Sequence, residues 1–143
     1  MSRDDEVLHS LDHYETALRR VSADFASRGA AVEPIGVQLG EMNGIFVSYR
    51  VTSGGGPRPY DQPPVPGDRR DRLPGVGALP MVTTVEEAVV ALADILQEKA
   101  LEEGDTAWPG CRPGHPHPPT PRLSAGTAVW SCPRDTTTLS GIG

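Results

Sequence analysis

The fold of this 143-residue chain is decided by residues 37–51, which read VQLGEMNGIFVSYRV. Two runs rich in apolar residues, Val37–Met42 and Ile45–Val51, flank the dipeptide Asn43-Gly44. Asn-Gly between such runs is a strong signal for a two-residue type I′ turn. The stretch therefore predicts a β-hairpin in which Met42 faces Ile45.

Both faces of the predicted hairpin are partly apolar. One face is expected to carry Met42, Ile45, Val47, Tyr49 and Val51, and the other Val37, Leu39 and Phe46 beside Glu41, Ser48 and Arg50. Since a lone two-stranded hairpin is marginally stable in water, we expect either further strands or dimerisation. One face would pack on a helix, and the other on another part of the chain or on a second subunit.

An amphipathic helix is predicted on the N-terminal side of the hairpin, over residues 3–28. Apolar residues recur there every three or four positions, as a helix with one buried face requires. These residues are Val7, Leu11, Tyr14, Leu18, Val21 and Phe25. Ser2 and Asp5 offer a capping box at the start of the helix, and Gly29 is a suitable residue to end it.

A second amphipathic helix is predicted to start near Thr84 and to end near Glu103. Thr84 and Glu87 have the spacing of a capping box. The apolar stripe consists of Val85, Ala88, Val89, Leu92, Ile95 and Leu96. The order helix, hairpin, helix indicates an α+β fold in which two amphipathic helices pack on a β-hairpin sheet.

Glycine and proline mark the irregular parts of the chain. Most of the 16 Gly and 15 Pro residues fall in two blocks, 54–80 and 109–121. We therefore expect one α+β domain over residues 1–104 with a Pro/Gly-rich insertion at 53–80. This insertion is either a tolerated loop or a lid or partner-binding loop that carries Tyr60. Residues 105–143 would form a metal-binding type of tail packed on the same domain.

The charge balance excludes some classes of partner. The formal net charge is −6, from 19 acidic and 13 basic residues, which argues against nucleic-acid binding and against an anionic membrane surface. The polar N-terminus lacks the apolar core of a signal peptide, so we expect a cytoplasmic protein. In that compartment Cys111 and Cys132 are expected to bind metal or to be buried, and not to form a disulfide.

The tail gathers the chemically distinctive residues of the chain. Trp108, Cys111, His115, His117, Trp130, Cys132 and Asp135 all fall between positions 108 and 135. Thiolates and imidazoles suit Zn²⁺, which takes four ligands in a tetrahedron. A loop with Cys111 and His115, joined by a hairpin over residues 122–130 to a loop with Cys132, resembles a zinc ribbon. The turn of that hairpin is expected at residues 124–127.

The spacing departs from the zinc-ribbon pattern and leaves the fourth ligand open. Three residues separate Cys111 from His115, where a ribbon has two, and Asp135 stands where a ribbon has Cys or His. The fourth ligand could be His117, Asp135 or a water molecule. Four protein ligands would make a closed structural site, whereas three would leave a position for a zinc-activated water. Without metal, the cysteines would be buried and the histidines exposed.

The tail also resembles known sequences. Trp-Pro-x-Cys at 108–111, the following His-Pro and Trp-x-Cys-Pro at 130–133 resemble the C-termini of small uncharacterised actinobacterial proteins with a zinc-ribbon-like end. The resemblance covers about 30 residues. It implies a recurring metal-binding tail and no particular activity.

These observations favour a binding or accessory protein that contacts a protein partner or a second copy of itself and carries a structural zinc. The chain contains no dinucleotide fingerprint, Walker loop or Gly-x-Ser-x-Gly elbow. The alternative is a small zinc enzyme with an open site and Asp135 or Glu41 as general base. A third interpretation is a small-molecule carrier or sensor with a pocket between helices and sheet.

His9 and His13 form a second pair of interest because they lie four positions apart on the first predicted helix. This is the spacing of the two ligands in His-Glu-x-x-His metalloproteases. Ser10 follows His9, however, so the general base of that motif is missing. We interpret the pair as part of a solvated helix face.

Overall fold

The computed structural model describes residues 3–51, 75–102, 108–111, 117–135 and 137–143. Along the chain the elements are α1 (Arg3–Ser27), β1 (Val32–Leu39), η1 (Glu41–Asn43), β2 (Ile45–Val51), β3 (Gly75–Leu79), α2 (Val85–Glu102), β4 (Thr120–Ser124), β5 (Thr127–Ser131) and β6 (Thr138–Gly141). Within these residues, two helices accompany two antiparallel sheets, ordered β1-β2-β3 and β4-β5-β6. The fold is mixed α+β, as the sequence predicts.

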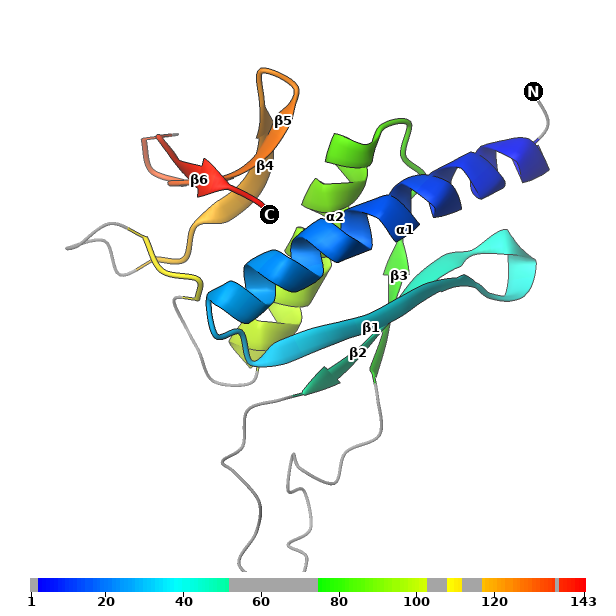
Figure 1. The fold of residues 1–143 in the computed structure, drawn as a ribbon, viewed down its shortest axis with the longest axis horizontal. Helices are drawn as coiled ribbons and strands as arrows, with labels where there is room; N and C mark the ends of the chain where they lie inside the picture. Colours follow the sequence, from blue (N-terminus) through cyan, green and yellow to red (C-terminus); the bar gives the residue numbers. More distant parts are fainter. Residues whose placement is uncertain (1–2, 52–74, 103–107, 112–116, 136) are drawn as a thin grey trace, which may run out of the picture.

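The helix pair lies between the two sheets (Figure 1). Helix α1 packs along α2 and β1, while α2 contacts β4 and β5 of the second sheet. Trp108, Trp130 and Ile142 of the tail belong to the same buried cluster as the apolar stripes of the helices. The tail therefore shares its hydrophobic core with the rest of the described chain. No helix in the described ranges is long and apolar enough to cross a membrane.

Both predicted helices are confirmed. At the end of α1, Gly29 has φ 65°, and the Ala30 N–H donates to the Phe25 carbonyl at 3.1 Å. This left-handed cap satisfies a carbonyl that the last helical turn leaves free. At the start of α2, Thr84 Oγ1 accepts a hydrogen bond from the Glu87 N–H at 3.1 Å, as the capping box requires. Ser2, the predicted cap of α1, lies outside the described residues.

The predicted hairpin is present, but its turn and register differ from the prediction. Leu39 pairs with Ile45, so the strands are joined by five residues instead of two. Met42 and Asn43 both have φ 59°, and the Gly40 N–H donates to the Gly44 carbonyl at 2.8 Å. The positive φ values that Asn-Gly signals are thus shifted by one residue, to Met42 and Asn43. Met42, predicted to face Ile45, is 96% exposed instead.

The register also changes which side chains share a face. Val37 pairs with Val47 and so lies on the buried, helix-facing side, where the prediction placed it on the opposite side. Leu39 shares the side of Ile45 for the same reason, although it is exposed at the end of its strand. The predicted burial of Ile45 and Val47 is confirmed.

A third strand, β3, completes the first sheet within the stretch that the sequence analysis assigned to the insertion. Gly75–Leu79 pairs antiparallel with β2, so the predicted boundary at residue 80 is wrong, and residues 53–74 lie outside the described part. The strand is short and contains two glycines, which weakens its signal. A Cβ at Gly77 would lie 2.5 Å from Ile95 Cδ1 of α2. The Ile95 side chain of α2 therefore packs directly over the backbone of β3 at Gly77, and a larger residue there would require this side chain to move.

The predicted C-terminal hairpin is confirmed and extended by a third strand. Ser124 pairs with Thr127, and the two turn residues Ala125 and Gly126 have φ of 50° and 81°. These values match the two-residue turn that suits the twist of a hairpin. Strand β6 adds to the edge of β5. Strand β6 is not predicted from the sequence.

Candidate metal centre

Two tryptophans fix the tail on the C-terminal end of α1. The rings of Trp108 and Phe25 lie 4.5 Å apart between centroids, and those of Trp108 and Trp130 lie 5.8 Å apart, both edge to face. The Trp108 Nε1–H donates to the Arg28 carbonyl at 3.1 Å. The Trp130 Nε1–H donates to the Asp24 carboxylate at 2.9 Å. Each indole is thus held by packing and by a hydrogen bond.

These anchors place the two cysteines. Cys111 follows Trp108 by three residues, and Cys132 follows Trp130 by two. Cys132 is completely buried, and its N–H donates to the Thr137 carbonyl at 2.9 Å. Cys111 is partly exposed. Both sulfur atoms therefore extend from segments that the aromatic cluster holds against the helices.

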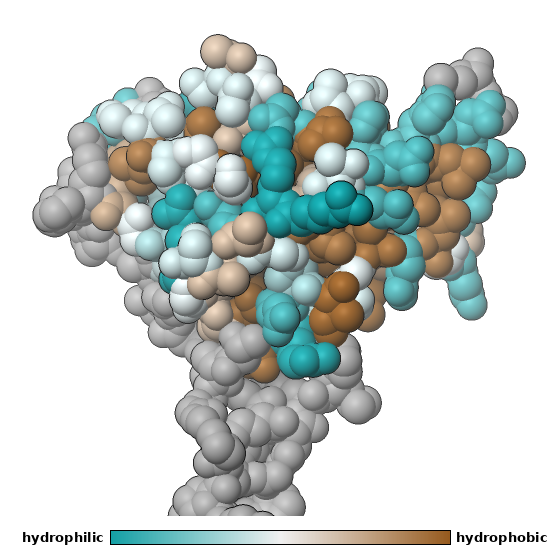
Figure 2. Space-filling view, in the orientation of Figure 1, coloured by the Kyte–Doolittle hydropathy of each residue, from teal (hydrophilic) through white to brown (hydrophobic). Residues whose placement is uncertain are grey.

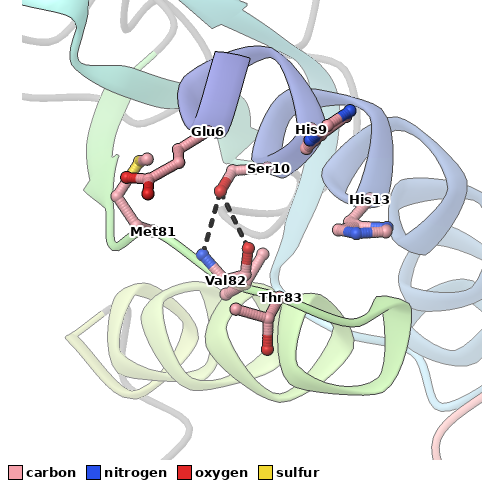
Figure 3. A pocket seen from close by; sticks show the side chains of 7 residues that line it. All are labelled: Glu6, His9, Ser10, His13, Met81, Val82 and Thr83. Carbon is pink, nitrogen blue, oxygen red and sulfur yellow. Dashed lines mark hydrogen bonds between the residues drawn. The ribbon is translucent and has the colours of Figure 1, made fainter. Parts of the chain in front are cut away.

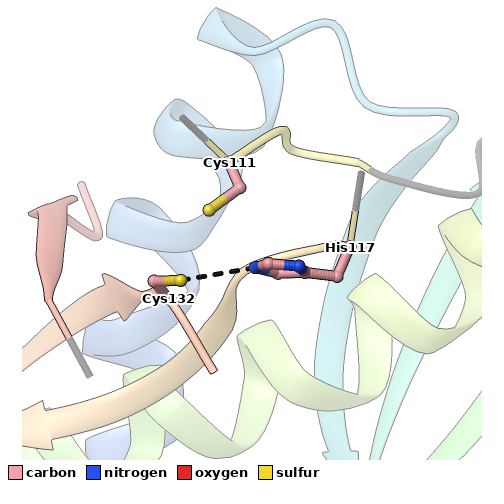
Figure 4. Close-up of side chains that lie close together, drawn as sticks. All are labelled: Cys111, His117 and Cys132. Atoms are coloured by element: carbon pink, nitrogen blue, oxygen red, sulfur yellow. Dashed lines mark hydrogen bonds between the residues drawn. The ribbon is translucent and has the colours of Figure 1, made fainter. Parts of the chain in front are cut away.

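Cys111, His117 and Cys132 come together in space (Figure 4). One ligand atom from each residue lies within 4.8 Å of the other two, and His117 Nε2 lies 3.3 Å from Cys132 Sγ. In a tetrahedral zinc site, Zn–S and Zn–N distances of about 2.3 and 2.0 Å place such atoms about 3.5–3.8 Å apart. The three side chains lie close enough to bind a metal ion after small adjustments.

Three of the five predicted ligands thus form the cluster. His115 lies outside the described residues. Asp135 is exposed and is not a member of the cluster, and its Oδ1 accepts a hydrogen bond from the Thr137 N–H at 3.0 Å. Glu41, the other candidate general base, is exposed in η1 between β1 and β2 and is not a member either.

A groove lies at the opposite end of α1 (Figure 3). Its volume is about 400 Å³, and it is lined by Glu6, His9, Ser10, His13, Met81, Val82 and Thr83. Ser10 Oγ donates to the Val82 carbonyl at 2.9 Å and accepts from the Val82 N–H at 3.0 Å, which fastens α1 to the segment before α2.

His9 and His13 border this groove away from the apolar stripe. His9 is exposed and His13 is partly exposed, as expected for a solvated face. Across the described ranges, the Cys111–His117–Cys132 cluster is the one group of three such ligand atoms close enough for a metal. The histidine pair does not form a second group of this kind.

No protein-family model, no curated protein and no solved structure matches the chain.

Proposed function

We propose that this chain is a small accessory protein in which Cys111, His117 and Cys132 hold a structural Zn²⁺ that fastens the C-terminal tail. One observation carries the proposal: the three ligand atoms, from three separate points of the tail, lie within 4.8 Å of one another. Two thiolates and an imidazole are soft to intermediate ligands, which favour zinc over magnesium or calcium.

A structural ion suits the construction of this tail. The second sheet has strands of only five, five and four residues, so it can bury little apolar surface by itself. A metal that joins residues 111, 117 and 132 would cross-link the segment before β4 to the segment after β5. The free energy of metal binding would then contribute directly to folding.

The identity of the fourth zinc ligand decides between a structural site and a catalytic one. The described residues supply three ligands, and His115 remains the nearest candidate in sequence for the fourth. With His115 bound, the site is closed and structural, as in zinc ribbons. With water bound instead, the alternative of a small zinc enzyme applies, because zinc lowers the pKa of a bound water toward neutrality.

The first sheet supports the second element of the proposal, a protein partner that is another copy of the chain. Strand β3 is at an edge of the described sheet and exposes Val76, a residue 56% exposed on the face turned away from α2. Ile35 on β1 is also exposed. On the face shown in Figure 2, apolar surface gathers over the N-terminal part of α1 and the β1–β2 hairpin.

Ligand substitution tests the structural zinc. We expect purified protein to hold about one zinc per chain, and Cys111→Ser and His117→Ala to lose it and unfold at a lower temperature. His9→Ala, which removes an exposed histidine outside the cluster, is the matched control and should change neither quantity. A Cys111→Ser protein that is as stable as wild type but has lost a zinc-dependent hydrolytic activity of the wild-type protein would favour the alternative, a small zinc enzyme. Protein without zinc after expression in zinc-supplemented medium contradicts both.

Light scattering after size exclusion tests self-association separately. The wild-type chain should have the mass of a dimer, and Val76→Glu should shift it to a monomer because the charge would be buried in the contact. A monomeric wild-type chain at high concentration contradicts this part of the proposal and leaves the zinc site unaffected.

A further inference from the structure

Gln97 of α2 joins the two segments that carry two of the metal ligands. Its side chain is buried, with the residue only 6% exposed. The amide Nε2 donates to the Trp108 carbonyl at 3.2 Å and to the Pro119 carbonyl at 2.6 Å. Both N–H groups of the amide are therefore used, one on each segment.

The two carbonyls stand next to the ligands in sequence. Trp108 precedes Cys111 by three residues, and Pro119 follows His117 by two. Neither carbonyl belongs to a strand: Trp108 is in a turn, and Pro119 stands just before β4. The amide on the helix thus supplies a link that no sheet ladder provides between these two positions.

We propose that Gln97 is a positioning residue of the metal centre, which holds the Cys111 and His117 segments at the separation that a shared zinc ion needs. This inference rests on the zinc site proposed above. Helix α2 is held in place by the hydrophobic core. The Gln97 side chain therefore has a fixed position, from which its amide can orient the two irregular segments. Groups that orient metal ligands from outside the coordination sphere commonly change metal affinity by about 10–100-fold when removed.

A purely structural role for Gln97 makes a different prediction. If the amide only stabilised the fold, its loss would lower the unfolding temperature and leave the metal affinity of the folded chain unchanged. Positioning instead predicts weaker metal binding by protein that is still folded, together with altered coordination geometry. The metal affinity and the absorption spectrum of the bound metal therefore distinguish the two roles, whereas the unfolding temperature does not.

The test compares Gln97→Met with Val47→Ala. Methionine keeps a similar length but has no N–H to donate, whereas Val47→Ala weakens the core at the first sheet, away from the ligands. The metal-free proteins are titrated with Co²⁺, and the visible absorption of the bound ion reports its ligands and geometry. Zinc affinity is then obtained by competition with a chelator, and circular dichroism confirms folding. If Gln97→Met does not fold, Gln97→Asn, whose amide is too short to reach both carbonyls, replaces it.

We expect Gln97→Met to bind zinc about 10–100-fold more weakly than wild type and to give a changed cobalt spectrum. Val47→Ala should lose stability and keep the wild-type affinity and spectrum. Equal affinity and identical spectra for Gln97→Met and wild type overturn the role of Gln97 alone. A wild-type chain that binds neither Co²⁺ nor Zn²⁺ overturns the zinc site itself, so the two failures are distinguishable.

Discussion

The indole Nε1–H of Trp130 donates a hydrogen bond to Oδ2 of Asp24 at 2.9 Å, which joins β5 to the last turns of α1. The same carboxylate accepts from the Gly143 N–H at 3.2 Å and from Arg28 Nε at 3.0 Å. Asp24 is only 6% exposed. A buried carboxylate with three donors therefore fastens the end of the chain to the first helix, independently of any metal.

Replacing Asp24 by alanine should lower the free energy of unfolding by about 1–3 kcal/mol, because the buried Trp130 Nε1–H loses its acceptor and the partly buried Gly143 N–H loses one as well. Urea denaturation measures this change. Asp12→Ala, on the exposed side of the same helix, is the matched control and should change stability by less than about 0.5 kcal/mol. Equal effects of the two substitutions contradict the role assigned to the Asp24–Trp130 contact.

Ser10→Ala should destabilise the protein by about 1–3 kcal/mol. The residue is 1% exposed, and its hydroxyl both donates to and accepts from the backbone of Val82, so its removal leaves a buried N–H and C=O without partners. Thermal unfolding measures this loss, with Thr16→Ala, at an exposed position of α1, as the matched control. The difference between the two variants is the contribution of the buried Ser10 hydrogen bonds. A Ser10→Ala protein as stable as Thr16→Ala would show that the linkage of α1 to residue 82 is unimportant.

Glu86 should give the protein a pH-dependent stability. Its carboxylate binds the Arg20 guanidinium and accepts from the Ala128 N–H at 3.2 Å, and these contacts hold its pKa below the usual 4.5, the Arg20 hydrogen bond most of all. Because the folded pKa is lowered, the stabilisation is fully present above the usual pKa and is lost as the pH falls through the folded pKa.

Substitution at Glu86 measures this contribution. Unfolding free energies from about pH 6 to about pH 3 should fall less steeply for Glu86→Gln than for wild type. The expected loss at neutral pH is about 1 kcal/mol, since the pair is only partly buried. Glu98→Gln, at an exposed position of α2, should follow the wild-type curve. Parallel curves for Glu86→Gln and wild type would contradict the assignment.

Removing the metal should loosen the ligand segments before the rest of the fold. With a zinc chelator, we expect faster amide hydrogen exchange at Cys132, whose N–H is bonded to the Thr137 carbonyl, and unchanged exchange at Val47 in β2. The Asp24–Trp130 bond involves none of the metal ligands, so β5 should remain docked. Uniform acceleration at both positions would instead indicate that the metal controls the whole fold.

The two helices could be predicted from the sequence because each repeats one pattern of apolar side chains along its length. Both helices were recognisable because apolar side chains recur with the helical period and capping residues stand at their ends. Strand β3 was missed because it is short and two of its five residues are glycine, which carries no strand signal. The predicted hairpin register was wrong because Met42 adopts a positive φ. Methionine rarely does so, and its residue type therefore gave no indication of this turn.

The candidate site was predictable by residue type but not by geometry. Cysteine and histidine are rare enough in this chain to attract attention, and three of the predicted ligands do meet. Asp135 does not join them, because its side chain bonds to the turn that leads into β6, a strand without a sequence signal. Gln97 and Asp24 gave no signal either, since a polar residue on a helix is ordinarily solvated. Their burial results from the docking of a tail that is distant in sequence.

Zinc K-edge X-ray absorption of the purified, metal-loaded protein tests the central claim most directly, because it measures which atoms surround the ion. Coordination by Cys111, His117 and Cys132 predicts two sulfur atoms at about 2.3 Å and at least one imidazole nitrogen at about 2.0–2.1 Å. Cys132→Ser should reduce the sulfur count to one or abolish binding. A first shell made only of nitrogen and oxygen atoms in the wild-type protein would contradict the proposed metal centre.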